Sequence, residues 1–392
     1  MKEKKNLGLY LHIPFCAKKC DYCDFYSFAP SDKKAMESYV SAMMLQMEDI
    51  SDACRSHVVD TVYFGGGTPS MLPISQFSRL MDSVRRNFRI AKDAEITSEA
   101  NPGTVDLKYL KALRKLGINR LSLGMQSLDD RELKTLGRIH SAEEFAYTFE
   151  NARRAGFDNI SVDIMYGLPD QTLSSFVDTL RGVTMLSPDH ISLYCLKIEE
   201  NTPFFAMRDT LRLPDDDTEY DMYMKAVDFL SARGYERYEM SNFASAGKYS
   251  RHNLKYWNCD EYIGIGASAH SYFGGERYSV IRNAERYVNG LEILEAGIPI
   301  IKDSRMIDKR ESMNEYVMLR MRLDAGVDMN EFKNRYGIDF YNKFGHLLDE
   351  YVESGFVKRI GDSYAFTSKG MFVSNYILSA ILDFSPEEMS TL

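Results

Sequence analysis

The first two-thirds of the chain alternates short apolar runs with longer stretches in which apolar residues recur every three or four positions. The short runs predict strands, and the longer stretches predict amphipathic helices. The predicted strands are residues 8–13, 60–64, 95–99, 120–124, 160–165 and 190–196. Six repeats of strand and helix imply parallel strands joined by right-handed crossovers. We therefore expect an α/β fold.

Polar and glycine-rich segments follow the carboxyl ends of these strands. Because barrels build their sites at that rim, an incomplete parallel (β/α)6 barrel fits better than an open sheet. Several helix ends are also readable. Asp32 opens a helix that runs to about residue 51, Thr104 is expected to cap a helix over 105–116, and Ser141 with Glu144 forms a capping box.

The pattern changes after residue 214. A long helix is expected over 215–233, followed by an irregular aromatic region. Helices near 309–323, 329–336 and 340–354 then lead to a hairpin around Gly361 and a final helix after Thr367. We predict a partial barrel over 1–240, an aromatic connecting region over 241–300 that closes it, and a small winged-helix-like α+β domain over 301–392.

Charge and composition narrow the function classes. The 392 residues include 57 acidic and 48 basic side chains, and the net charge of -9 disfavours a nucleic-acid partner. No apolar run approaches the ~20 residues that a membrane span needs. The basic N-terminus lacks a signal-peptide cleavage site. We expect a cytoplasmic protein with reduced thiols, since three of its six cysteines are scattered rather than arranged as a disulfide framework.

The strongest chemical signal is the trio Cys16, Cys20 and Cys23, on the loop after the first predicted strand. Three thiolates at this spacing can hold three irons of a 4Fe–4S cluster and leave the fourth iron to an exogenous ligand. Structural zinc is the alternative, but it requires four ligands and is usually bound by two cysteine pairs. No second pair exists here, and His12 lies on the preceding strand, where it is a poor fourth ligand.

Residues 65–67 are three consecutive glycines, and Thr68 follows them directly after the second strand. Glycine lets backbone approach a ligand where a Cβ would clash. Such loops are often only turns. One βα unit after the cysteines, however, the segment fits a site for the amino and carboxylate groups of S-adenosylmethionine.

Three further strand ends carry polar side chains, namely Glu99, Gln126 and Asp163. Directed at one rim, they would supply donors and acceptors for a ribose and an α-amino acid. Each could equally be a loop cap or a solvated side chain. Arg138, in isolation, would be read as a surface arginine.

The segment 251–257 contains His252, Tyr256 and the only tryptophan, Trp257. Aromatic side chains beside an imidazole resemble the wall of a flat apolar ligand's pocket, with the histidine as an axial ligand. The alternative is a core aromatic cluster that closes the open barrel.

Together these motifs resemble the radical S-adenosylmethionine family of oxygen-independent coproporphyrinogen III oxidases, over nearly the whole chain. The resemblance implies a 4Fe–4S cluster on the three cysteines and S-adenosylmethionine as a second cofactor. It implies contacts to S-adenosylmethionine from Tyr10, Gly66, Gly67, Thr68, Glu99, Gln126, Arg138 and Asp163. It also implies contacts from the backbone at Lys197 and from the segment around His270.

Two departures select a branch of this family. The oxidases carry a fourth cysteine two residues after the third, where this chain has Phe25, and they carry a long arm before the first cysteine, where this chain has fifteen residues. Both features, with the segment around His252, resemble the haem chaperone (HemW) branch. That resemblance implies haem as a bound ligand, His252 as a candidate axial ligand, and an acceptor protein as partner.

We therefore expect a haem chaperone. The alternatives are oxidative decarboxylation of coproporphyrinogen III, a radical enzyme that modifies haem, and a zinc-bound interaction module.

Overall fold

A computed structural model describes residues 5–292 and 300–383 of the chain. The chain divides into two compact units, the first comprising Met1–Met222 with Glu261–Met306 and the second Tyr223–Asp260 with Ile307–Leu392. Each unit thus combines two separate stretches of sequence. The boundaries that we expected near residues 240 and 300 do not coincide with this division, and the three-part scheme stays a prediction.

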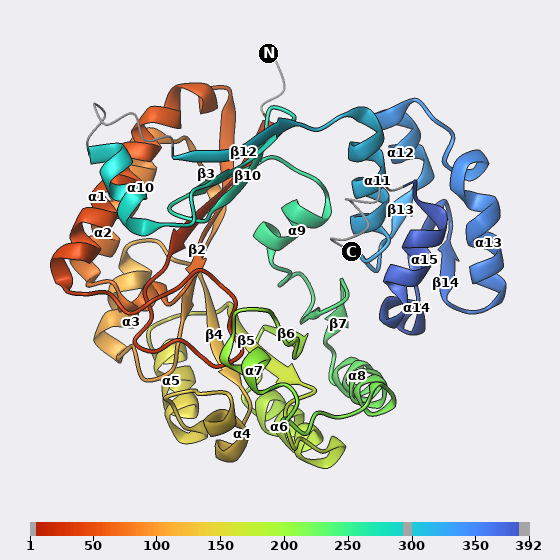
Figure 1. Ribbon diagram of the computed structural model, residues 1–392, viewed down its shortest axis with the longest axis horizontal. Helices are drawn as coiled ribbons and strands as arrows, with labels where there is room; N and C mark the ends of the chain where they lie inside the picture. The colour runs from red at the N-terminus through yellow and green to blue at the C-terminus, as the bar shows by residue number, and fades with distance from the viewer. Residues whose placement is uncertain (1–4, 293–299, 384–392) are drawn as a thin grey trace. The chain divides into compact units, whose positions relative to one another are not determined.

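The first unit is built on six parallel strands that neighbour one another in chain order, which confirms the expected parallel α/β architecture. They are β1 (Lys5–Ile13), β2 (His57–Gly66), β3 (Ile90–Ala100), β4 (Arg120–Gln126), β5 (Ile160–Tyr166) and β6 (His190–Cys195). The connecting helices line the outer side of this curved sheet (Figure 1). They are α1 (Lys33–Ser51), α2 (Ile74–Asn87), α3 (Leu107–Lys115), α4 (Asp130–Thr135), α5 (Ala142–Arg154), α6 (Leu173–Met185) and α7 (Pro203–Met207), with short 3-10 turns at Asp52–Cys54 and Pro69–Met71.

Helix caps explain where several of these helices begin. Asp32 accepts a 2.8 Å hydrogen bond from the Ala35 amide at the start of α1, and the capping box of Ser141 and Glu144 is present at α5. The expected cap at Thr104 is wrong. Asp106 caps α3 instead, because the Thr104 hydroxyl donates to the Asn101 carbonyl at 2.6 Å and is directed away from the helix.

Four later strands extend the sheet on the β1 side. The strand β9 (Tyr262–Ile265) runs parallel to β1, and β10 (His270–Phe273), β11 (Glu276–Val280) and β12 (Ile301–Met306) follow in antiparallel order, with α10 (Ala284–Glu292) between the last two. The side chain of Gln46 on α1 bonds to this added part of the first unit. Its Oε1 accepts from the Gly266 amide, just after β9, at 2.9 Å and from the Tyr287 hydroxyl of α10 at 2.6 Å.

Alternate residues of the central strands divide into an apolar face and a polar face. Phe64, for example, packs on Phe77 of α2 at 4.6 Å between ring centroids, whereas its neighbour Tyr63 bonds to Glu99 across the sheet. The side chains on the face opposite the helices are nearly all polar. This polar inner face consists of Tyr10, Thr61, Tyr63, Thr97, Glu99, Arg120, Ser122, Ser161, Asp163, His190 and Ser192.

The second unit is smaller and mixed. The helix α8 (Asp216–Ser231) passes from the first unit into it, and the strand pair β7 (Glu236–Arg237) and β8 (Asn242–Ala244) and the helix α9 (Arg251–Trp257) follow. Its remaining helices are α11 (Lys309–Arg320), α12 (Met329–Tyr336), a π-helical turn at Tyr341–Gly345, α13 (His346–Glu353), α14 (Ser368–Phe372) and α15 (Ser374–Ile381). A three-stranded sheet contains β13 (Val327–Asp328), β14 (Val357–Ile360) and β15 (Ser363–Phe366), which confirms the predicted hairpin and small C-terminal domain.

Within residues 5–292 and 300–383, no helix has the length and apolarity needed to cross a membrane.

Candidate functional site

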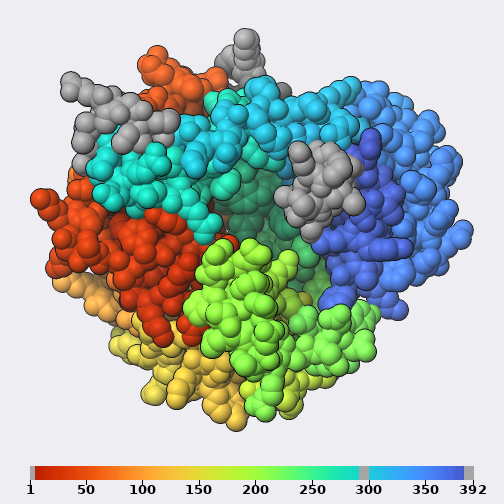
Figure 2. All heavy atoms as spheres, viewed as in Figure 1, coloured from red at the N-terminus to blue at the C-terminus, as the bar shows by residue number. Residues whose placement is uncertain are grey.

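The cysteine loop follows β1, and its two ends are hydrogen-bonded to each other. The amide of Cys16 donates to the Phe28 carbonyl at 3.0 Å, and the Phe28 amide donates to Pro14 at 2.8 Å, so the loop is closed at its base. Near its middle, the Asp21 carbonyl accepts from the Phe204 amide of α7 at 3.0 Å. Figure 2 shows this N-terminal segment, in red, against the lime-green segment around residue 200.

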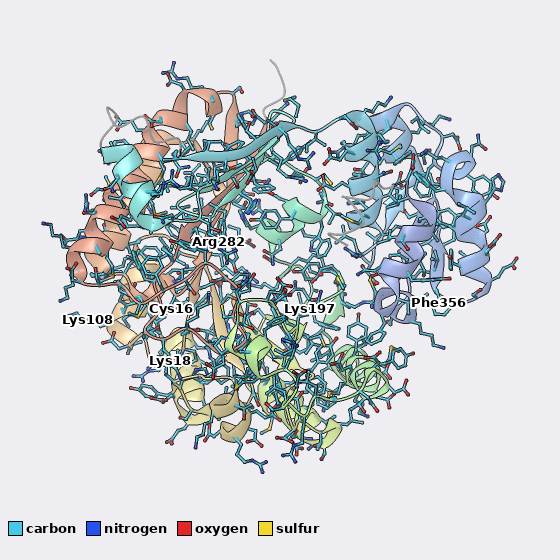
Figure 3. The ribbon with its side chains drawn as sticks, in the orientation of Figure 1. Cys16, Lys18, Lys108, Lys197, Arg282 and Phe356 are labelled. Atoms are coloured by element: carbon cyan, nitrogen blue, oxygen red, sulfur yellow. The ribbon has the colours of Figure 1, made fainter. Side chains whose placement is uncertain are left out.

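The three thiols of the loop have different surroundings. The Cys16 sulfur is buried, 3.5 Å from the Thr68 hydroxyl at the end of the glycine segment. The Cys20 sulfur accepts from Arg138 Nη1 at 3.5 Å. Burial raises the pKa of Cys23, and the charges of Cys20 and Cys16 raise it further, so both of these sulfurs lie within electrostatic range of Cys23. Figure 3 marks Cys16 and Lys18 on this loop.

No three His, Cys, Asp or Glu side chains are already gathered as a metal site in the part of the chain that the structure describes. The donor set nevertheless fits an iron–sulfur cluster, because three thiols share one short loop and a buried arginine at Cys20 favours thiolate. The fourth ligand of a zinc site is not supplied by His12. Its Nδ1 lies 3.1 Å from the Tyr10 hydroxyl, and its Nε2 lies 2.8 Å from the Tyr26 carbonyl.

The glycine segment packs directly on the cysteine loop. The amides of Gly67 and Thr68 donate to the carbonyls of Ile13 and Phe15, both at 2.8 Å. A Cβ at Gly67 would lie 2.8 Å from the Phe15 oxygen, and a Cβ at Gly66 would lie 2.6 Å from the His12 ring. Glycine is therefore required here for contact between two loops. The amides of Gly67 and Thr68 are thus bonded to protein, and contact of this segment with a ligand stays a prediction.

Glu99 and Asp163 lie on the polar inner face, one strand apart from each other across β4. The Glu99 carboxyl accepts from the Tyr63 hydroxyl at 2.8 Å and from the Gly66 amide at 3.2 Å. Burial raises its pKa to about 7, and that of Asp163 is raised for the same reason, although a 3.3 Å hydrogen bond from Ser122 opposes the shift. The charge state of both acids therefore depends on their burial and on the groups that hydrogen-bond to them.

Arg138 connects the end of β4 to the cysteine loop and is not a surface side chain. Its Nη2 donates to the Asn101 side-chain oxygen at 2.8 Å, and the Asn101 amide donates to the Thr68 hydroxyl at 2.8 Å. A Cβ at Gly124 would lie 2.8 Å from Asn101 Oδ1, 3.2 Å from Gln126 Nε2 and 3.3 Å from Arg138 Nη2. The polar ends of three side chains therefore converge above a glycine, beside Cys20.

An open hollow lies next to the end of the cysteine loop. It has a volume of about 510 Å³ and is lined by Asp24, Glu199, Glu200, Asn201 and Arg282. Arg282 donates to the Asp24 carbonyl at 2.8 Å, which joins the segment after β11 to the loop. Figure 3 shows Arg282 and Lys197 near this face of the first unit. Phe25, which follows Asp24, is 71% exposed.

The histidine of the aromatic segment belongs to the second unit. His252 is buried at the start of α9, and its Nε2 lies 2.8 Å from the Tyr256 hydroxyl, one helical turn later. The two rings meet edge to face, with 5.2 Å between their centroids. Iron coordination by Nε2 therefore requires the tyrosine hydroxyl to release it.

Sequence reasoning missed two side chains of the site. Asn101 bridges Thr68 and Arg138, and Tyr22 bonds to Arg138 between Cys20 and Cys23. A signal for Asn101 existed, since it directly follows a strand end that carries Glu99. Tyr22 had no signal beyond its place inside the cysteine motif.

Profiles of two known families match the chain. That of the radical SAM superfamily matches residues 10–183, and that of the HemN C-terminal domain matches residues 307–373. The chain is also similar to solved coproporphyrinogen III oxidase (HemN) from Escherichia coli, described as a radical SAM enzyme. The two share 25% sequence identity with a TM-score of 0.84, over 98% of this chain and 91% of that one.

Curated relatives match along almost their whole length. Heme chaperone HemW of Bacillus subtilis (strain 168) is 34% identical over 95% of this chain and 98% of its own. Heme chaperone HemW of Escherichia coli (strain K12) is 35% identical over 97% of this chain and 100% of its own. With a radical SAM barrel, a HemN-type C-terminal domain and this degree of identity, the chain belongs to the HemW family of radical SAM proteins.

Proposed function

We propose that this protein binds haem and passes it to an acceptor protein, as a radical SAM haem chaperone. The observation that carries the proposal is the identity of 34–35% with relatives named heme chaperone HemW, sustained over 95–97% of the chain. The partners of the protein would be a haem-acceptor protein and an electron donor. The acidic net charge of -9 favours proteins over nucleic acid as those partners.

Cys16, Cys20 and Cys23 would hold the 4Fe–4S cluster. Their placement on one loop, closed at its base and bonded to α7, supports this assignment. When bound, a cluster with S-adenosylmethionine supplies one-electron cleavage to a 5′-deoxyadenosyl radical. The protein's own contribution is to orient the sulfurs and to cover them, through the glycine segment on one side and Arg138 on the other.

S-adenosylmethionine would be bound by Tyr10, Gly66, Gly67, Thr68, Glu99, Gln126, Arg138 and Asp163. All but Arg138 belong to β1–β5 or to the loops directly after them, and Arg138 lies in the loop after α4. Glu99 and Asp163 would accept hydrogen bonds from hydroxyl and ammonium groups, and Arg138 would pair with a carboxylate. The convergence of Gln126 and Arg138 above Gly124, beside Cys20, supports a site next to the cluster loop.

Haem would bind at α9 with His252 as an iron ligand. A neutral imidazole is a common protein ligand to haem iron. Tyr256 and Trp257 would offer flat apolar surface, and Arg251, which is exposed, would pair with a propionate. Haem entry would exchange the bond between His252 and Tyr256 for a bond to iron.

Haem titration followed by transfer tests the proposal. Anaerobically reconstituted protein should develop a Soret band at one haem per chain and lose it when a haem-free acceptor such as apomyoglobin is added. The control is haem alone at the same concentration, which sets the uncatalysed rate of uptake. Protein that shows no saturable Soret change would exclude the chaperone function.

A second candidate is oxygen-independent coproporphyrinogen III oxidase, favoured by the structural likeness to HemN along 98% of the chain. Against it, Phe25 stands in the place of the oxidases' fourth cysteine, and its side chain is 71% exposed. Product analysis with coproporphyrinogen III, described in the Discussion, separates the two functions.

A further inference from the structure

Gln126 ends β4 in a strained backbone conformation. Its φ is +72°, in the left-handed region that residues other than glycine rarely adopt. The pairing of β4 with β5 also shifts register between Gly124 and Gln126, so the strand bulges at Met125. At this irregular strand end the Gln126 side chain meets Arg138 above Gly124. A left-handed residue with a side chain is costly and persists only where the surrounding structure holds it.

Ser127, the residue after Gln126, is fully buried and makes hydrogen bonds to the start of α4. Its hydroxyl donates to Glu132 Oε2 at 2.5 Å and accepts from the Asp129 amide at 2.9 Å. The same hydroxyl lies 3.5 Å from that of Thr179 on α6. The backbone directly after the strained residue is thus tied to two helices of the first unit.

The buried carboxylate of Glu132 receives two further hydrogen bonds. Its Oε2 accepts from Gln171 Nε2 at 3.1 Å, and its Oε1 accepts from the Ser175 hydroxyl of α6 at 2.9 Å. Gln171 Oε1 in turn accepts from the amide of Leu168, in the loop after β5, at 3.2 Å. Bonds from three directions fix the position of the carboxylate. Of these three bonds, the one from Ser127 reaches the end of β4.

We propose that Ser127 and Glu132 are positioning residues of the S-adenosylmethionine site, which hold Gln126 in its left-handed conformation so that its side-chain amide reaches the ligand. The proposal rests on the proposed contact between Gln126 and S-adenosylmethionine. Once Ser127 is released, the strained backbone before it relaxes towards an ordinary conformation. The Gln126 amide then leaves its place above Gly124, and its hydrogen bond to the ligand is lost.

The first test is Ser127→Ala, with S-adenosylmethionine affinity of the reconstituted protein measured by calorimetry and stability measured by the melting temperature. The variant should bind about three- to tenfold more weakly than wild type, the equivalent of one hydrogen bond. The matched control is Ser175→Ala, which removes a hydroxyl donor from the same carboxylate but acts at the start of α6. It should lower the melting temperature and bind S-adenosylmethionine as tightly as wild type.

Two variants of Glu132 separate its role as an acceptor from its role in packing. Glu132→Met has similar length but accepts no hydrogen bond from Ser127, so its affinity should fall to within about twofold of that of Ser127→Ala. Glu132→Gln keeps one oxygen to accept from Ser127, and its NH2 group can donate to the Ser175 hydroxyl. The affinity of this conservative variant should therefore match that of wild type.

A double-mutant cycle tests whether Ser127 acts through Gln126. Gln126→Gly removes the amide, and glycine adopts a φ of +72° without strain. This variant should bind S-adenosylmethionine more weakly than wild type. Adding Ser127→Ala to it should change the affinity by less than about twofold, because the side chain to be positioned is already absent. Residues that act independently would instead multiply their effects.

Three results would overturn the proposal: wild-type affinity in Ser127→Ala and Glu132→Met, an equal loss of affinity in Ser175→Ala, or multiplied effects in the double mutant. If Ser127→Ala does not fold, Glu132→Met carries the same comparisons. Wild-type affinity in Gln126→Gly would instead refute the proposed contact of Gln126 with S-adenosylmethionine, so the two failures are distinguishable.

Discussion

The guanidinium of Arg138 donates from Nη1 to the sulfur of Cys20 at 3.5 Å. The same side chain donates to Asn101 at 2.8 Å and, through it, is linked to Thr68 and the glycine segment. A residue that appears unremarkable in the sequence therefore joins three separate loops at the rim of the sheet. Positive charge at a cysteine sulfur favours the thiolate that a metal requires.

The cluster assignment predicts which cysteine substitutions abolish the cluster and which do not. Cys16→Ala, Cys20→Ala and Cys23→Ala should each abolish a cluster of about four irons per chain, because each removes a ligand of one cubane. Cys54→Ala and Cys195→Ala should keep it, since neither lies on the cysteine loop. Iron and acid-labile sulfide analysis with the visible spectrum measures this. Stoichiometric zinc without sulfide would contradict the assignment.

A bulky substitution in the glycine segment should weaken binding of the cluster and of S-adenosylmethionine together. Gly67→Val places carbon atoms against the carbonyls of Phe15 and Ile13, so the cysteine loop must move. Iron content and S-adenosylmethionine affinity should both fall by more than tenfold, as judged by iron assay and calorimetry. The matched control is Gly156→Ala, at φ +93 with nothing within 4 Å of the new Cβ. It should cost about 1–2 kcal/mol of stability and leave both cofactors bound; equal losses in the two variants would show a general folding defect.

The chaperone assignment predicts no oxidase activity. Protein with cluster, S-adenosylmethionine and reductant should form no protoporphyrinogen from coproporphyrinogen III, because the fourth cysteine of the oxidases is replaced by the exposed Phe25. Carbon dioxide release and porphyrin chromatography measure the outcome. Sustained release over many turnovers would refute the assignment.

The haem proposal predicts opposite effects for two neighbouring residues. His252→Ala should lose or shift the Soret band while the cluster and the melting temperature are retained. Tyr256→Phe removes the 2.8 Å bond that occupies His252 Nε2 and should tighten haem binding by roughly three- to tenfold, the equivalent of one hydrogen bond. Absorption titration and thermal unfolding of both variants provide the measurement. An unchanged haem spectrum and affinity in His252→Ala would exclude the axial ligand role.

The buried histidine before the cysteine loop predicts a loss of stability in acid. Burial lowers the pKa of His12 from an ordinary 6.5 to about 4. Between these values the unfolded chain binds the proton and the folded chain does not, so the free energy of unfolding falls as pH falls from 6.5 to 4. His12→Gln, which can still donate to the Tyr26 carbonyl, should reduce this slope. Urea unfolding at several pH values tests it, and an unaltered slope would show that other groups, such as His140, carry the effect.

The six parallel strands were predictable because each is a short apolar run between polar segments, and the structure begins β4, β5 and β6 where the sequence predicted them. The pairing of β9 with β1 was not predictable. It depends on contacts between remote segments, such as the 3.0 Å bond between His57 and Glu261. Local patterns carry no information on such pairings.

Within the site, strand ends identified Glu99, Gln126 and Asp163, whose contacts to a ligand stay predictions. The buried polar inner face was missed although a pattern existed, since polar and apolar residues alternate along Arg120, Leu121, Ser122 and Leu123. Such alternation is usually read as a strand with one solvated face. Here the polar face is buried instead, and only the three-dimensional register shows that charged groups meet there.

The position of β1 between β2 and β9 has a consequence for biosynthesis. The strand that carries the cysteine loop is made before the other strands of this sheet, yet one of its two edges has no neighbour until Tyr262 and the residues after it leave the ribosome. Non-local pairings of this kind form late and leave an exposed edge in the meantime. Nascent chains truncated before residue 262 should therefore be prone to aggregate, and insertion of iron should follow the completion of the sheet rather than accompany synthesis of the cysteines.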